Sequence, residues 1–123
     1  TGFGWYLNAY CWYMKEHDGY LYLGTWDLSR TIAFLGERAE NVAPPFKPLL
    51  NKLVANPQDW GSPMGGDLYR TADGIHWDPV FLDGLGRPDN HGIRTLESTR
   101  MGLFVGTENP FTRLEVWRMS DEY

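Results

Sequence analysis

Two segments of this chain repeat one another at a constant offset of 82 residues, and this repeat restricts the possible folds more than any other feature. Residues 1–25 align without a gap with residues 83–107. The aligned positions that are identical in both copies are, in the first copy, Gly2, Gly4, Asn8, Leu21, Gly24 and Thr25. An internal repeat of this kind is typical of a fold that uses one structural unit more than once.

A second match between the copies has a shorter offset of 48 residues, which aligns residues 67–73 with residues 115–121. The difference between the two offsets shows that the first copy contains 34 residues that the second lacks. Without them the repeating unit is about 48 residues long, which is the usual length of one four-stranded blade of a β-propeller. The sequence therefore predicts two blade-like units, with an insertion in the first at about residues 28–65.

Hydrophobic alternation and turn residues predict the strands of these units. The pairs Asp18-Gly19 and Asp73-Gly74 indicate tight hairpin turns between strands. The predicted strands are residues 6–16, 20–27, 67–72, 77–82, 92–99, 103–108 and 114–120. Inside the insertion, apolar residues at helical spacing predict one short helix over residues 48–55.

These elements predict an all-β fold, namely a fragment of a β-propeller. Its first blade has four strands and occupies residues 1–82, including the helical insertion. Its second blade occupies residues 83–123 and lacks its outer strand, because only three strands are predicted there. The remaining blades are expected from the same or another chain, since a closed propeller needs roughly four to eight of them.

Composition supports a folded β-protein and excludes several classes of function. The chain of 123 residues contains 6 Trp, 7 Tyr and 6 Phe, which a disordered segment would not. No apolar run approaches the roughly 18–20 residues of a membrane helix, so no membrane insertion is expected. The net charge of −5, with no cluster of Lys and Arg, argues against a nucleic-acid partner. The single Cys11 lies in an aromatic run and is predicted to be a buried, unreactive thiol.

The segment Leu68–Trp77 reads Leu-Tyr-Arg-Thr-Ala-Asp-Gly-Ile-His-Trp and resembles a degenerate Asp box. Residues 84–95 and 106–118 resemble other parts of the same repeats. The chain is thereby similar to sialidase-like bacterial β-propeller proteins with Asp-box, or BNR-type, repeats, and looks like their C-terminal part. The resemblance implies that Asp73 closes its own turn and that Trp77 packs between blades. It also favours an extracytoplasmic or secreted location.

The loops between blades and the loops between the second and third strands of a blade share one face of a propeller, where ligands usually bind. On that face the sequence places aromatic side chains, which can stack on sugar rings, beside polar side chains, which can bind hydroxyl groups. The candidate ligand-binding residues are Trp5, Trp26, Asp27, Arg87, Asn90, His91, Glu108 and Asn109. The candidate catalytic residues are Arg94, Glu97 and Asp89, because glycoside hydrolysis uses paired carboxylates and sialidase-type hydrolysis also needs arginine.

Three functions are consistent with these residues. The leading hypothesis is a ligand-binding or scaffold propeller whose ligand is a glycan or another small molecule. The first alternative is a sialidase-like or other propeller hydrolase whose active site is shared with further blades. The second alternative is an assembly element that completes a propeller with another chain. No cofactor is expected, and no metal site, because the histidines occur at none of the usual ligand spacings.

Overall fold

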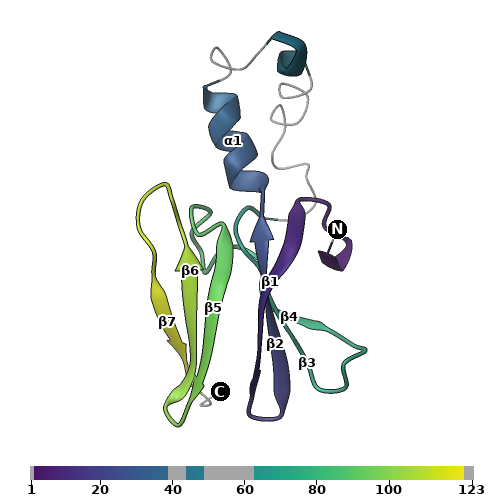
Figure 1. Ribbon diagram of the computed structural model, residues 1–123, viewed down its shortest axis with the longest axis vertical. Helices are drawn as coiled ribbons and strands as arrows, with labels where there is room; N and C mark the ends of the chain where they lie inside the picture. Colours follow the sequence, from purple (N-terminus) through teal and green to yellow (C-terminus); the bar gives the residue numbers. More distant parts are fainter. Residues whose placement is uncertain (1, 39–43, 49–62, 121–123) are drawn as a thin grey trace.

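The computed structural model describes residues 2–38, 44–48 and 63–120, and in these ranges the chain is mostly antiparallel β-sheet. Figure 1 shows the sheet as a curled half-barrel with the α-helix standing at one end. The strands are β1 (Asn8–His17), β2 (Tyr20–Asp27), β3 (Leu68–Thr71), β4 (Asp78–Phe81), β5 (Gly92–Thr99), β6 (Gly102–Glu108) and β7 (Val116–Met119). The helical elements are α1 (Ser29–Glu37) and the 3₁₀ turns η1 (Gly2–Gly4) and η3 (Pro44–Phe46).

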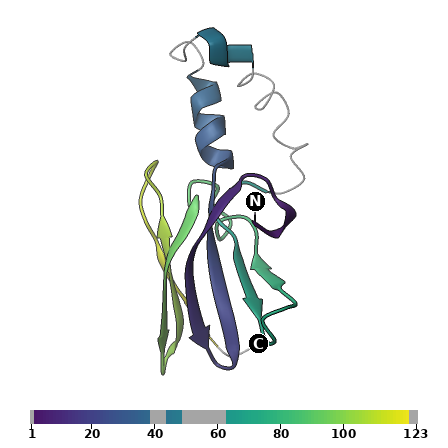
Figure 2. The same cartoon turned by 45° about the vertical axis from the view of Figure 1, so that its right-hand side comes forward.

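The strands form two antiparallel meanders. The first meander consists of β1 to β4 and the second of β5 to β7, and each strand pairs with its neighbours in sequence. The meanders join where the end of β2 pairs with the start of β5, at Trp26 and Gly92. Both views show the meanders side by side, with α1 extending from the end at which β2 finishes (Figures 1 and 2). The predicted all-β fold is confirmed at this level.

Tight turns occur at both predicted Asp-Gly pairs. In the β1–β2 hairpin, Asp18 and Gly19 have φ values of 48° and 80°, as a two-residue type I′ turn requires. In the β3–β4 connection, the Asp73 carboxylate accepts the backbone N–H groups of Ile75 and His76, each at 2.8 Å. The prediction that Asp73 closes its own turn is therefore confirmed.

The sequence repeat is also a repeat of backbone structure. Phe3 and Leu85, which are aligned at the offset of 82, both have the left-handed φ that is uncommon for such residues, 57° and 63°. The strands β1 and β5 each contain a β-bulge at the same aligned position, at Trp12 in β1 and at Arg94 in β5. Aligned side chains of the two meanders therefore occupy equivalent places in their own meander.

The hydrophobic core lies between the two meanders. Its buried members are Tyr22, Leu68, Ile93, Leu96, Leu103 and Val105. At Gly24 of β2 the meanders are so close that a Cβ atom would lie 2.6 Å from the Cβ atom of Ile93 in β5. The first meander can pack on β5 only because β2 carries no side chain at this position.

The described part of the insertion begins with α1, which the sequence analysis did not predict. The Asp27 carboxylate starts this helix by accepting the backbone N–H of Ser29 at 2.8 Å. The helix that was predicted over residues 48–55 lies, apart from its first residue, outside the described residues. Among the described helices, none has the length and apolar character needed to cross a membrane.

Cys11 is exposed, which corrects the prediction of a buried thiol. The apolar run that contains it follows β1, where Tyr10, Tyr13 and Met14 are 48%, 43% and 55% exposed. An apolar run predicts burial only if another element covers the strand, and the described part of the chain leaves much of this strand open.

Candidate functional site

Three aromatic side chains form a partly exposed cluster near the helix-bearing end of the sheet. This aromatic platform consists of Tyr10 and Trp12 from β1 and Trp26 from β2. The ring centroid of Tyr10 lies 5.2 Å from that of Trp26 and 5.7 Å from that of Trp12. Tyr10 is 48% exposed and both indoles are half-buried, so the platform presents aromatic surface to solvent.

A bulge and a glycine place the platform. One of the two bulges in β1 is at Trp12, and bulges change the direction in which a strand presents its side chains. A Cβ atom at Gly92 would lie 2.4 Å from the Trp12 ring and 3.0 Å from the Trp26 ring. The residue aligned with Gly92 in the first meander is Tyr10. The repeat itself therefore does not require glycine here, whereas the two indoles do.

Polar groups of the second meander border the platform. The indole N–H of Trp26 donates to His91 Nε2 at 3.1 Å, and His91 also contacts the Glu108 carboxylate. The guanidinium of Arg94 lies 5.5 Å from the Trp12 ring centroid, within the range of a cation–π contact. The structure thus brings together Trp26, His91 and Glu108, which the sequence placed on one face, and adds Arg94 beside them.

His91 lies between the platform and the helix α1. Burial lowers the pKa of His91, and the neighbouring Glu108 carboxylate partly opposes this effect. Nε2 of His91 faces both the Trp26 indole N–H and the Glu108 carboxylate, and the Thr31 hydroxyl lies 3.3 Å from Nδ1. The platform is therefore linked to α1 through His91.

Each meander also contains an equivalent buried network anchored by an asparagine. Asn8 Nδ2 donates to the Asp67 carboxylate at 2.8 Å, and Asn90 Nδ2 donates to the Glu115 carboxylate at 2.8 Å. Both asparagines are completely buried. The candidate Asn90 thus lies inside the fold, where it joins the start of β5 to the segment before β7.

The two networks differ in charge. In the second, Arg87 forms an ion pair with Glu115 at 2.5 Å. In the first, the aligned residue is Trp5, whose indole N–H donates to Asp27 at 2.5 Å, and Asp67 has no ion-pair partner among the described residues. Burial raises the pKa of Asp67 to about 7 and also raises the pKa of Asp27. Asp67 is therefore a buried carboxyl group that holds a proton up to near-neutral pH.

The remaining candidate residues also have partners. Asp89 accepts a hydrogen bond from Arg30 Nε of α1 at 2.7 Å. Glu97 on β5 accepts one from Lys15 Nζ of β1 at 3.3 Å, and Glu97 is the more exposed of these two side chains. Asn109 is buried and accepts backbone N–H groups of the turn that follows β6. Arg87, Asp89 and Asn109 therefore lie in contacts that connect loops, outside the aromatic platform.

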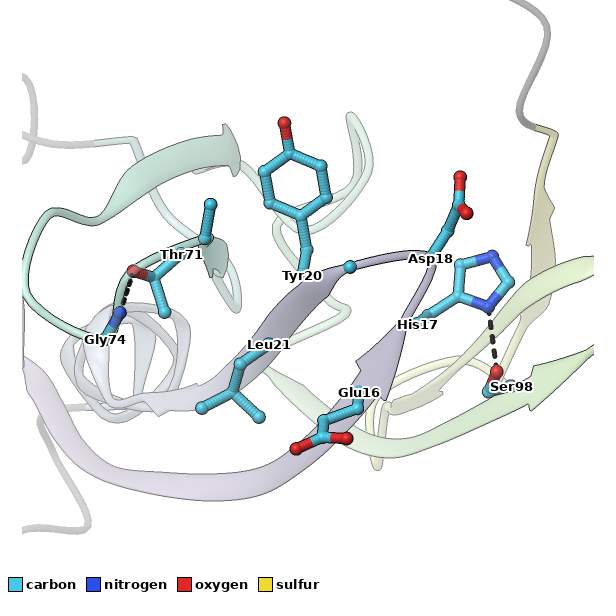
Figure 3. A pocket seen from close by; sticks show the side chains of 10 residues that line it. Glu16, His17, Asp18, Tyr20, Leu21, Thr71, Gly74 and Ser98 are labelled. Carbon is cyan, nitrogen blue, oxygen red and sulfur yellow. Dashed lines mark hydrogen bonds between the residues drawn. The ribbon is translucent and has the colours of Figure 1, made fainter.

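A hollow of about 410 Å³ lies at the other end of the sheet, where the β1–β2 and β3–β4 turns meet. Figure 3 shows His17 of β1 pointing toward Ser98 of β5, and His17 Nδ1 lies 2.8 Å from Ser98 Oγ. On the other side of the hollow the Thr71 hydroxyl accepts the Gly74 N–H at 2.9 Å. The His17–Ser98 bond connects the two meanders, as the Lys15–Glu97 pair does.

Tyr10 and Trp12 are platform residues that are absent from the candidates of the sequence analysis. The signal that could have found Tyr10 is its alignment with Gly92, where a large aromatic residue replaces the smallest residue. Among the residues that the structure describes, no group of three or more His, Cys, Asp or Glu side chains is placed to hold a metal ion. Comparison with protein families, with curated proteins and with solved structures finds nothing that matches this chain.

Proposed function

We propose that this chain is part of a ligand-binding β-propeller of the Asp-box type, and that its ligand is a carbohydrate that stacks on the aromatic platform. The observation that carries the proposal is the platform itself. The ring centroids of Tyr10, Trp12 and Trp26 lie within 6.2 Å of one another, and all three side chains are partly open to solvent. Clustered aromatic surface that a fold leaves open marks binding sites.

Carbohydrate is the ligand class that this surface fits best. Sugar rings have apolar faces that pack on aromatic rings, and their hydroxyl groups need donors and acceptors around the edge. Arg94 supplies donors at the border of the platform, and Glu108 supplies acceptors. These side chains carry one charge of each sign, so the border favours a neutral sugar over a polyanion, which the net charge of −5 also disfavours.

The propeller part of the proposal rests on how the meanders repeat. They share an aligned left-handed turn before the first strand, an aligned β-bulge and an aligned asparagine-to-carboxylate bond. They pack through the faces of their sheets, with Gly24 against Ile93. Successive four-stranded antiparallel sheets around a common axis are the architecture of a propeller.

The arrangement of the carboxylates in this region suits ligand binding better than glycoside hydrolysis. Glycoside hydrolysis needs two carboxyl groups that flank the scissile bond, one of them able to donate a proton. Glu97 and Asp89 are each held by a basic side chain. Glu108 is engaged with His91 at the border of the platform. These groups are placed to orient side chains and a ligand.

Replacing Trp12 or Trp26 with alanine is expected to weaken carbohydrate binding by about tenfold. Each change removes one stacking surface, and an aromatic contact contributes about 0.5–1.5 kcal/mol beyond the area that it buries. The measurement is a screen of neutral oligosaccharides against the wild-type chain, followed by calorimetric titration of the best binder with each variant.

The matched control is Trp117→Ala, because Trp117 is a tryptophan of β7 that is 45% exposed and lies outside the platform. This variant should bind as the wild type does, and circular dichroism should give the same sheet signal for all variants. Equal affinities for Trp12→Ala, Trp26→Ala and Trp117→Ala would show that the platform is not the binding surface. Binding of acidic but not neutral oligosaccharides would contradict the choice of a neutral sugar.

A further inference from the structure

The first meander packs on β5 through one face of its sheet, and the second meander exposes the equivalent face to solvent. In the first meander, Gly24 of β2 pairs with Leu68 of β3, and Leu68 is completely buried against β5. In the second meander, the aligned pair is Gly106 and Val116, and Val116 is 66% exposed. This open face of the second meander contains a hollow of about 330 Å³ lined by Arg94, Thr95, Gly106, Thr107, Glu108, Asn109, Leu114 and Val116.

The strand that would fill such a surface is also present in the chain. In the existing junction, β5 inserts Ile93 and Leu96, which are 0% and 1% exposed. The aligned residues of β1 are Cys11 and Met14, and both are exposed. Among the residues that the structure describes, the second meander therefore has an open receiving face and β1 is an open inserting strand.

Contacts between the inner strands indicate that the two surfaces are complementary. Within the chain, Lys15 of β1 meets Glu97 of β5 at 3.3 Å, and Trp12 of β1 meets Arg94 of β5 at 5.5 Å. Both pairs join residues that are aligned at the offset of 82. When β1 of another copy lies beside β5 in the same way, Glu97 again meets a lysine and Arg94 again meets a tryptophan.

We propose that the open face of the second meander binds β1 of a second copy of this chain, head to tail. A head-to-tail contact uses two different surfaces, and it generates a closed ring if the rotation between copies closes. A propeller of roughly four to eight blades corresponds to about two to four copies of this chain. Lys15 and Glu97 then alternate around the axis, so that every neighbour has the opposite charge. This inference rests on the propeller architecture proposed above, and the open face shares Arg94 and Glu108 with the border of the aromatic platform.

The test is the mass of the full chain in solution, measured by sedimentation velocity at several micromolar concentrations. The wild type is expected to form a discrete oligomer. Val116→Asp, which places a charge in the open face, should reduce it to a monomer. The matched control is Ile75→Asp, because Ile75 is 76% exposed in the β3–β4 turn, outside both surfaces. A monomeric wild type, or an oligomer that Val116→Asp leaves intact, overturns the proposal and assigns the open face to another partner.

A charge swap tests the register of the contact. Lys15→Glu and Glu97→Lys, made singly, place like charges at each junction and should shift the chain toward monomer. The double variant restores an opposite pair within the chain and between copies, and should recover the oligomer. A folded double variant that remains monomeric overturns the head-to-tail register.

Discussion

Replacing Gly24 with alanine is expected to destabilise the chain by about 3 kcal/mol, at the upper end of the range for overpacked interiors. The added Cβ would lie 2.6 Å from two side-chain atoms of Ile93 and 2.7 Å from its carbonyl oxygen. Changing the rotamer of Ile93 cannot relieve the last of these contacts, so the whole of β5 would have to move. The measurement is urea-induced unfolding followed by tryptophan fluorescence.

The control for this substitution is Gly2→Ala. Gly2 is conserved between the two copies of the repeat, as Gly24 is, but a Cβ at Gly2 would only reach ordinary contacts at 3.9 Å. This variant should unfold at nearly the same urea concentration as the wild type. If Gly24→Ala also unfolds at the urea concentration of the wild type, the meanders do not pack through this glycine, and the description of a core shared between them is wrong.

The second large effect concerns pH, because the stability of the chain should fall as pH rises from about 4 toward 7. The folded-state pKa of Asp67 is raised to about 7 from an ordinary value of 3.8. In this interval the folded chain keeps the proton that the unfolded chain releases, so deprotonation favours unfolding. The difference in pKa corresponds to roughly 4 kcal/mol. The raised pKa of Asp27 adds to this slope, and the lowered pKa of His91 opposes it.

Asp67→Asn should remove most of this slope, because asparagine cannot ionise. Its amide oxygen can still accept hydrogen bonds from Asn8 and Tyr69, as the carboxylate does. The measurement is the free energy of unfolding at a series of pH values. A wild-type profile that is flat between pH 4 and pH 7 would show that Asp67 ionises freely in the folded chain.

Glu115 supplies a control of opposite sign in the equivalent network. Hydrogen bonds from Trp117 and Asn90, together with Arg87, lower the pKa of Glu115 below its ordinary value of 4.5. Its contribution to stability is therefore present above that value and is lost as pH falls through the lowered pKa. Glu115→Gln should destabilise the chain at neutral pH and leave the slope between about pH 6 and pH 7 unchanged.

Much of the fold could be predicted from the sequence because its signals are local. The alternation of side chains and the Asp-Gly turns predict strands over residues 20–27 and 92–99, and these are the bounds of β2 and β5 in the structure. The helix α1 was missed because it has no side-chain cap at the usual position, and its first N–H is satisfied by Asp27 instead. Cys11 was misplaced because burial depends on what covers a strand, which a local pattern does not contain.

The candidate site was predictable only in part, for a related reason. Trp26, His91 and Glu108 meet because the ends of β2, β5 and β6 meet, and the repeat already implied that arrangement. Polar residues at strand ends look alike in sequence, whether they face a ligand or a buried partner. Only the structure distinguishes Asn90, which is completely buried, from Arg94, which is exposed beside the platform.

The most direct test of the proposed function is an NMR titration of the ¹⁵N-labelled chain with the neutral oligosaccharide that binds best in the screen. The six tryptophans each give an indole N–H signal, which reports on that side chain separately. The signals of Trp12 and Trp26 should shift as the sugar is added, while those of Trp5, which is buried, and Trp117, on β7, should remain in place. Unshifted Trp12 and Trp26 signals at a sugar concentration that saturates binding would contradict the proposal that the aromatic platform holds the ligand.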